Sequence, residues 1–170
     1  KIVSLYSQRN NIAISINFNS SAELIDEIDM GEPADIFISG HSGLIETLKQ
    51  KGLVDVYNVS YIAQDRLNLV TSKNNPDISS EILKKKLGFN ESLRTLDKIK
   101  ASIVIDQEES TSGLYSDQAI KSLSLEKLRL FQKLPEDKTA IFSILHRDTE
   151  NYAILLSSQV KNKEDLLVLS

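Results

Sequence analysis

Residues 18–40 read FNSSAELIDEIDMGEPADIFISG, and the period of the apolar residues changes twice within this stretch. The segment 12–18, which leads into it, alternates apolar and polar residues as a half-buried strand does. Ser20 and Glu23 have the S-x-x-E spacing of a capping box, which begins a helix. DIFIS, residues 35–39, is short and apolar enough for a buried parallel strand. The stretch therefore predicts a strand–helix–strand unit.

The rest of the chain continues this alternation of strands and helices. Apolar or alternating runs predict strands at 66–72, 102–106, 152–156 and 165–169, and helical patterns occupy 2–9, 44–52, 80–100, 113–123 and 135–147. Because helices connect successive strands, we expect right-handed crossovers onto a parallel sheet, which is an α/β fold. The polar loop at 73–80 predicts a lobe boundary near residue 70.

Composition and charge exclude several classes of function. The chain has 170 residues, of which 41% are hydrophobic and 26% charged, and this balance is typical of a soluble globular protein. A formal net charge of −4 without a basic stripe argues against a nucleic-acid partner. No apolar run reaches the length of about 18 residues that suggests a membrane span. The absence of cysteine excludes disulfides and thiolate chemistry.

Motifs for catalysis and for metal binding are weak. GHSG, residues 40–43, lacks one residue of the G-x-S-x-G nucleophile elbow. No carboxylate stands at a spacing from His41 that indicates a catalytic pair. We therefore interpret His41 as a residue at a helix start and not as a catalytic base. The acidic loop 106–109 could hold a hard cation, but a solvated loop is the preferred interpretation. The sequence does not predict an enzyme.

Small hydroxyl residues recur where a predicted strand gives way to a helix. They occur at 19–21 and 110–113, and helices are also expected to open at 39–40 and 135–138. Each helix N-terminus offers unpaired N–H groups and the positive end of a dipole, which together suit an anion. Any one of these positions is more simply explained as a helix cap, because Ser and Thr are common there. Together, these positions would indicate an anion-binding site if the helix starts faced one cleft at a topological switch point, where α/β sheets bind ligands.

The stretch 18–40 also resembles the first-lobe signature of periplasmic molybdate-binding proteins of ABC importers. That signature is a strand, F-x-S-S, a helix and then G-x-P-A-D-[LIV]-F-[LIV]-S, and the segments 52–55, 66–70, 102–123 and 134–158 continue the similarity. The resemblance implies a two-lobed, class II periplasmic-binding-protein fold with parallel-rich sheets flanked by helices. It also implies a periplasmic or lipid-anchored extracytoplasmic protein that binds molybdate or tungstate, uses no cofactor and delivers the anion to a membrane permease.

The family's ligand contacts can be placed on this sequence one residue at a time. The resemblance implies ligand-binding roles for Ser20, Ser21, Gly40, Ser112 and Lys138. Ser21 would supply a hydroxyl, and Ser112 and Lys138 would supply backbone or helix-start donors. Leu156 stands where the family carries a tyrosine, so this hydroxyl donor is lost.

The resemblance also implies how the chain divides into lobes. We expect residues 1–70 to form a first lobe without its opening strand, 71–160 a second lobe, and 161–170 the start of a return segment. A first lobe that lacks a strand should expose a sheet edge, which pairs with a neighbouring chain or frays.

Two other functions stay open at this point. One is the effector-binding domain of a transcription regulator with the same lobe architecture. The other is a degenerate relative that binds no anion and serves as a structural or interaction module, which Leu156 favours.

Overall fold

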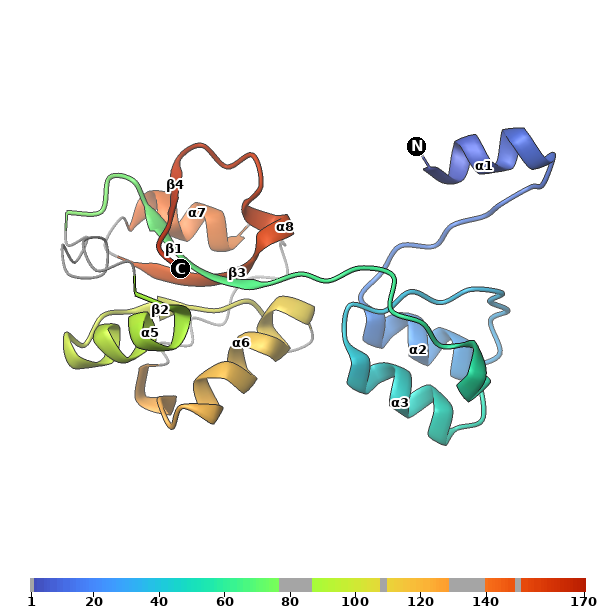
Figure 1. Ribbon diagram of the computed structural model, residues 1–170, viewed down its shortest axis with the longest axis horizontal. Helices are drawn as coiled ribbons and strands as arrows, with labels where there is room; N and C mark the ends of the chain where they lie inside the picture. Colours follow the sequence, from blue (N-terminus) through green and yellow to red (C-terminus); the bar gives the residue numbers. More distant parts are fainter. Residues whose placement is uncertain (1, 77–86, 108–109, 129–139, 149–150) are drawn as a thin grey trace.

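The computed structural model describes residues 2–76, 87–107, 110–128, 140–148 and 151–170 (Figure 1). The helices are α1 (Ile2–Asn10), α2 (Ser21–Asp29), α3 (Ser42–Gln50), α5 (Phe89–Lys98), α6 (Thr111–Ser122), α7 (Ala140–Arg147) and α8 (Ser157–Val160), with short 3-10 turns η1 (Val56–Asn58) and η2 (Glu126–Leu128). The strands are β1 (Leu67–Ser72), β2 (Ile103–Val104), β3 (Tyr152–Leu156) and β4 (Leu166–Val168). The predicted α/β class is confirmed.

The four strands form one mixed sheet in the order β2-β3-β1-β4. Only β2 and β3 are parallel, with Ile103 opposite Tyr152. β1 runs antiparallel to β3 and to β4. The expectation of a parallel-rich sheet is therefore wrong for the described residues. The reason is that β1 runs in the opposite direction to both of its neighbours, β3 and β4, and the apolar pattern of a short strand does not reveal its direction.

Alternation along the strands places apolar side chains on both faces of this sheet. Leu69 and Ile154 lie in a core cluster with residues of α5 and α6. Val70 and Leu155 lie in a second cluster with residues of α7. α5 and α6 accordingly lie on one side of the sheet and α7 on the other (Figure 1). Burial on both faces, as predicted for 152–156, is confirmed.

Residues 2–66 carry α1, α2 and α3, all three of which the sequence predicts. The capping box predicted for α2 is present, because Ser20 and Glu23 exchange side-chain and backbone contacts. Gly31 and Gly52 follow α2 and α3 with φ of +100° and +69°, values that favour glycine. These local signals decide the helix boundaries.

The two strands predicted in this N-terminal part are wrong. Segments 12–18 and 35–39 are not strands, and Phe18 and Ile36 are 87% and 82% exposed. A strand forms only when a neighbouring backbone completes its hydrogen bonds, and neither segment meets such a neighbour within the described residues. The alternating pattern was present, but the pairing that it requires was not.

The division into lobes 1–70 and 71–160 stays a prediction. β1 crosses the predicted boundary and pairs with β3 and β4, so it belongs to the sheet of the C-terminal part. The segment 161–170 contains β4 and joins the same sheet.

Most of the predicted helix extensions 80–88 and 135–139 fall outside the described residues. None of the helices in the described ranges has the length and apolar character that crossing a bilayer requires.

A buried hydroxyl at the end of β1 provides a test of the fold. Thr71 Oγ1 donates to the Asn151 carbonyl at 2.8 Å and accepts from Asn75 Nδ2 at 2.7 Å, and its side chain is fully buried. Thr71→Val keeps the shape but removes both bonds, so we expect a loss of roughly 1–3 kcal/mol in the free energy of unfolding by urea titration. Thr71→Ser retains the hydroxyl and should lose less; an equal loss in both variants would contradict this role.

Candidate functional site

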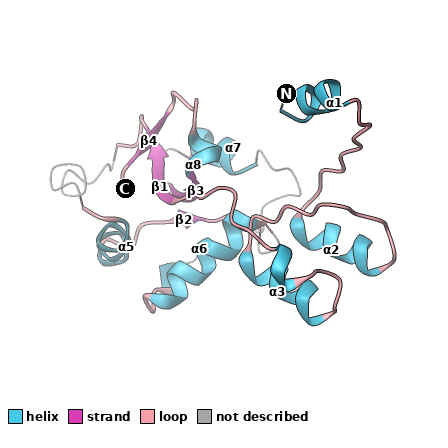
Figure 2. Ribbon diagram, turned by 45° about the vertical axis from the view of Figure 1, so that its right-hand side comes forward, coloured by secondary structure: helices cyan, strands magenta, loops and turns pink. Residues whose placement is uncertain are grey.

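The N-termini of α2, α3 and α6 approach one another at one place in the molecule (Figures 1 and 2). The Gly40 N–H, which precedes α3, donates to Ser21 Oγ in the first turn of α2 at 3.4 Å. On its other side Gly40 faces Thr111, the first residue of α6. A Cβ built on Gly40 would lie 2.7 Å from Thr111 Oγ1, so glycine permits this close approach. We call this meeting point of the three helices the α2–α3–α6 junction.

The two serines at the start of α2 have different surroundings. Ser20 is the N-cap, and its Oγ accepts from the Glu23 N–H at 3.2 Å and donates to Glu23 Oε2 at 2.6 Å. Its hydroxyl is therefore used within the helix cap. Ser21 Oγ accepts from Gly40, and no described contact uses its proton. Of the two predicted ligand residues, Ser21 is the one with a hydroxyl proton available at the junction.

The start of α6 holds a buried hydroxyl without a partner. Ser110 caps the helix, since its Oγ accepts from the Gly113 N–H and donates to the Gln107 carbonyl, both at 2.9 Å. Ser112 is only 2% exposed, yet its Oγ has no hydrogen-bond partner within the described part of the chain. A buried polar atom without a partner costs free energy, so its presence calls for an explanation such as a bound group.

A ring contact adds to the approach of α3 and α6. The His41 and Tyr115 rings lie 4.8 Å apart between centroids, at an angle of 40°. Gly43 makes room for the imidazole, because a Cβ there would come within 2.8 Å of His41 Cε1. His41 Nδ1 is buried and has no partner among the described residues. Sequence reasoning placed His41 at a helix start but missed its contact with Tyr115, and its position next to Gly40 was the available signal.

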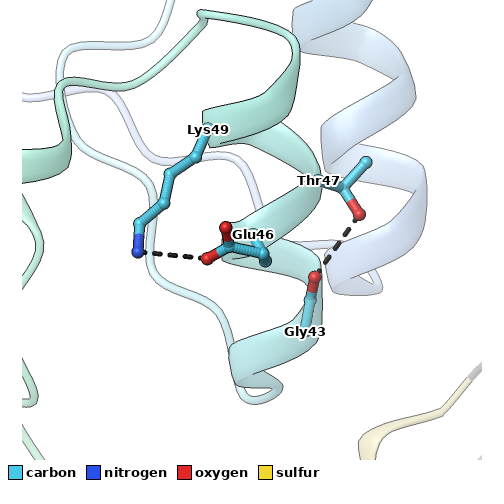
Figure 3. A network of polar contacts seen from close by, with 4 residues as sticks. All are labelled: Gly43, Glu46, Thr47 and Lys49. Atoms are coloured by element: carbon cyan, nitrogen blue, oxygen red, sulfur yellow. Dashed lines mark hydrogen bonds and ion pairs between the residues drawn. The ribbon is translucent and has the colours of Figure 1, made fainter.

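The junction contains hydroxyl, amide and imidazole groups but no Lys or Arg among the described residues that meet there. Within α3, Lys49 Nζ pairs with Glu46 at 3.2 Å, and Thr47 Oγ1 donates to the Gly43 carbonyl at 3.4 Å (Figure 3). The charge of this lysine is thus balanced inside its own helix. Positive potential at the junction comes instead from the N-terminal ends of three helix dipoles. Such an arrangement suits an anion bound through neutral donors.

The other predicted site residues stand apart from these contacts. Lys138 lies outside the described residues. Leu156 ends β3, is half-buried and caps α8, with its N–H donating to Gln159 Oε1 at 2.8 Å. In the described ranges no group of three or more His, Asp or Glu side chains is placed to hold a metal ion. A hollow beside α1, lined by Ile2, Leu5, Tyr6 and Arg9, includes none of the predicted ligand residues.

Gly113 allows the loop before α6 to fold back on the first turn of that helix. A Cβ on this residue would lie 1.8 Å from the Gln107 carbonyl oxygen, and the contact is with backbone that cannot move aside cheaply. We expect Gly113→Ala to lower the free energy of unfolding by about 1–3 kcal/mol or more. Gly88→Ala is the matched control, because nothing lies within 4 Å of the Cβ built there. Urea titrations of both variants check this, and equal stability would contradict it.

The chain is similar to one protein family and to a solved structure. The profile of the bacterial extracellular solute-binding protein family matches residues 1–169. A solved structure, described as the substrate-binding domain of a proposed molybdenum ABC transporter from Clostridium difficile, aligns with a TM-score of 0.64 at 21% identity and covers 98% of this chain and 69% of that chain. No protein of curated function is similar enough to count as a match. The chain therefore belongs to the bacterial extracellular solute-binding protein family.

Proposed function

We propose that the chain is the extracytoplasmic substrate-binding component of an ABC importer and that it binds a tetrahedral oxyanion, molybdate or tungstate. The site would be the α2–α3–α6 junction. The observation that carries this proposal is the buried Ser112 hydroxyl without a partner, at the N-terminus of a helix that meets two other helix N-termini. The solved structure that aligns with this chain is described as belonging to a molybdenum transporter, and this likeness supports molybdenum as the first element to test.

The donors at the junction match the chemistry of a fully ionised oxyanion. Such an anion accepts hydrogen bonds on every oxygen and offers no proton. The bond from the Gly40 N–H to Ser21 Oγ leaves the serine proton free to point at the anion. The Ser112 N–H lies in the first turn of α6, where the helix itself supplies no acceptor. Neutral donors aligned with helix dipoles can balance a dianion without a basic side chain.

Two further groups affect the expected affinity. Lys138, which the family resemblance places at another helix start, would add a full positive charge to the site. Leu156 contributes no hydroxyl, so one donor of the family site is missing. A hydrogen bond to a charged group contributes about 1.5–3 kcal/mol, and its loss therefore weakens binding by roughly tenfold to a hundredfold. We expect a weaker site than one with the tyrosine present.

Binding at this place would link the N-terminal part to the sheet part. The N-terminal part, which carries α1 to α3, touches α6 through Gly40 and Thr111 and through the His41 and Tyr115 rings. An anion held by Ser21 on one side and Ser112 on the other would favour the arrangement in which both reach it. A membrane permease that accepts only this arrangement could then distinguish the loaded from the empty protein.

A second candidate function rests on a specific observation. Leu156 stands where the family resemblance implies a tyrosine hydroxyl, and this favours a degenerate relative that has kept the fold as an interaction module without anion binding. The two functions differ in one measurable property, which is anion binding by the folded chain.

Calorimetric titration with molybdate, tungstate, sulfate and phosphate tests the proposed function. We expect heat with molybdate or tungstate, and a loss of affinity of at least about tenfold in Ser21→Ala, because one charge-assisted donor is removed. Ser42→Ala is the matched control, since Ser42 begins α3 as Ser21 begins α2 but is exposed. Circular dichroism checks that each variant is folded. Absence of heat with all four anions on the folded wild-type chain would favour the interaction module instead.

A further inference from the structure

Two buried polar atoms without a partner in the described part of the chain lie on the two sides of the contact between α3 and α6. One is Ser112 Oγ in the first turn of α6, and the other is Nδ1 of His41, at the N-cap position of α3. Gly40, next to His41, closely approaches Thr111, next to Ser112, so both atoms belong to the α2–α3–α6 junction. A buried polar atom without a partner costs free energy, and one group bound between the two would satisfy both.

The backbone and the ring of His41 are held in place. Its N–H donates to Ser39 Oγ at 3.1 Å, and its carbonyl accepts from the Leu44 N–H at 3.2 Å. Its ring lies against Tyr115 of α6, with centroids 4.8 Å apart, and over Gly43, where a Cβ would come within 3.1 Å of Nδ1. The imidazole makes no capping bond to α3. Nδ1 therefore stays at the start of α3 without serving the helix, which leaves it to a ligand.

Among the described residues that meet at the junction, His41 is the one whose side chain can become a cation. The other titratable group in contact with its ring is the Tyr115 phenol. Carboxylates on the surrounding helices have described partners other than the imidazole: Glu46 pairs with Lys49 on α3, Asp117 with Lys121 on α6, and Glu23 with the Ser20 cap of α2. A helix N-terminus repels a cation, and a buried charge needs a partner, so an imidazolium at this place requires an anion beside it.

We propose that His41 is a further anion-binding residue of the junction, and that it binds the oxyanion as an imidazolium that donates its Nδ1 proton. This inference rests on the proposed function. Molybdate and tungstate offer only acceptors, so a nitrogen that faces them must carry a proton. Imidazole gains its second proton as the pH falls from about 8 to about 5, and a neighbouring anion favours the charged form. Binding therefore takes up a proton from the solvent, and the affinity rises as the pH falls.

Calorimetric titration of the full 170-residue chain with dilute tungstate, between about pH 6 and about pH 8, tests this coupling. The wild-type affinity should rise toward low pH by up to about tenfold per pH unit for one proton. The heat should also depend on the ionisation heat of the buffer, because the buffer supplies the proton. His41→Gln keeps an N–H donor but cannot become charged, so its affinity should be independent of pH.

His146→Gln is the matched control, because the chain has two histidines and His146 lies outside the junction. Its Nε2 pairs with Asp165 Oδ2 at 2.7 Å, so this variant should keep the wild-type pH dependence. A pH dependence that remains in His41→Gln, or that disappears in His146→Gln, would overturn the inference. Wild-type binding with no proton uptake overturns this inference alone, whereas no heat with any anion overturns the proposed function and this inference with it.

NMR of the imidazole groups gives a readout that does not depend on affinity. The chain has two histidines, and the spectrum of His146→Gln assigns the ring signals of each. Adding tungstate at about pH 7 should move the His41 signals toward those of an imidazolium and leave the His146 signals in place. His41 signals that stay unchanged when tungstate saturates the chain would contradict the proposed contact. Circular dichroism checks that each variant is folded.

Discussion

The pairing of β3 with both β1 and β2 is the interaction on which the rest of the structure depends. β3 lies in the middle of the sheet part, with Tyr152 to Leu155 buried, and it joins β1 on one side to β2 on the other. α6 packs against β3 and β1, so the sheet fixes the position of that helix. The N-terminus of α6 then lies where it meets α3. Without this strand, the donors of α6 would have no defined place.

The two parts of the chain differ in what holds them together. Residues 67–170 have two apolar clusters, one on each face of the sheet, and helices cover both. Residues 2–66 have short helices and little buried apolar surface; α2 has a capping box, whereas the N-cap of α3 makes no side-chain hydrogen bond. Capping contributes about 1 kcal/mol per helix, which cannot replace a core. Among the described contacts, Gly40 and His41 join the N-terminal part to α6, through Thr111 and Tyr115.

The sequence predicted the local structure well and the pairing poorly. Helices were found because their signals are short-range, as in the Ser20 and Glu23 capping box and the glycine after α2. Segments 12–18 and 35–39 carry the pattern of strands but are unpaired, because a strand depends on partners that no local pattern describes. For the same reason the direction of β1, which is opposite to that of β3 and β4, could not be predicted. At the candidate site, Ser21, Gly40 and Ser112 were named from the sequence, whereas the Thr111 and Tyr115 contacts arise from packing.

The central claim is that an oxyanion binds where α2, α3 and α6 meet. Anomalous X-ray diffraction at the tungsten LIII edge, from crystals of this chain grown with tungstate, locates the anion directly. The account predicts one strong peak whose oxygens lie within hydrogen-bonding distance of Ser21 Oγ and the Ser112 N–H. A peak at another place, or no peak in crystals that diffract well at saturating tungstate, would contradict it.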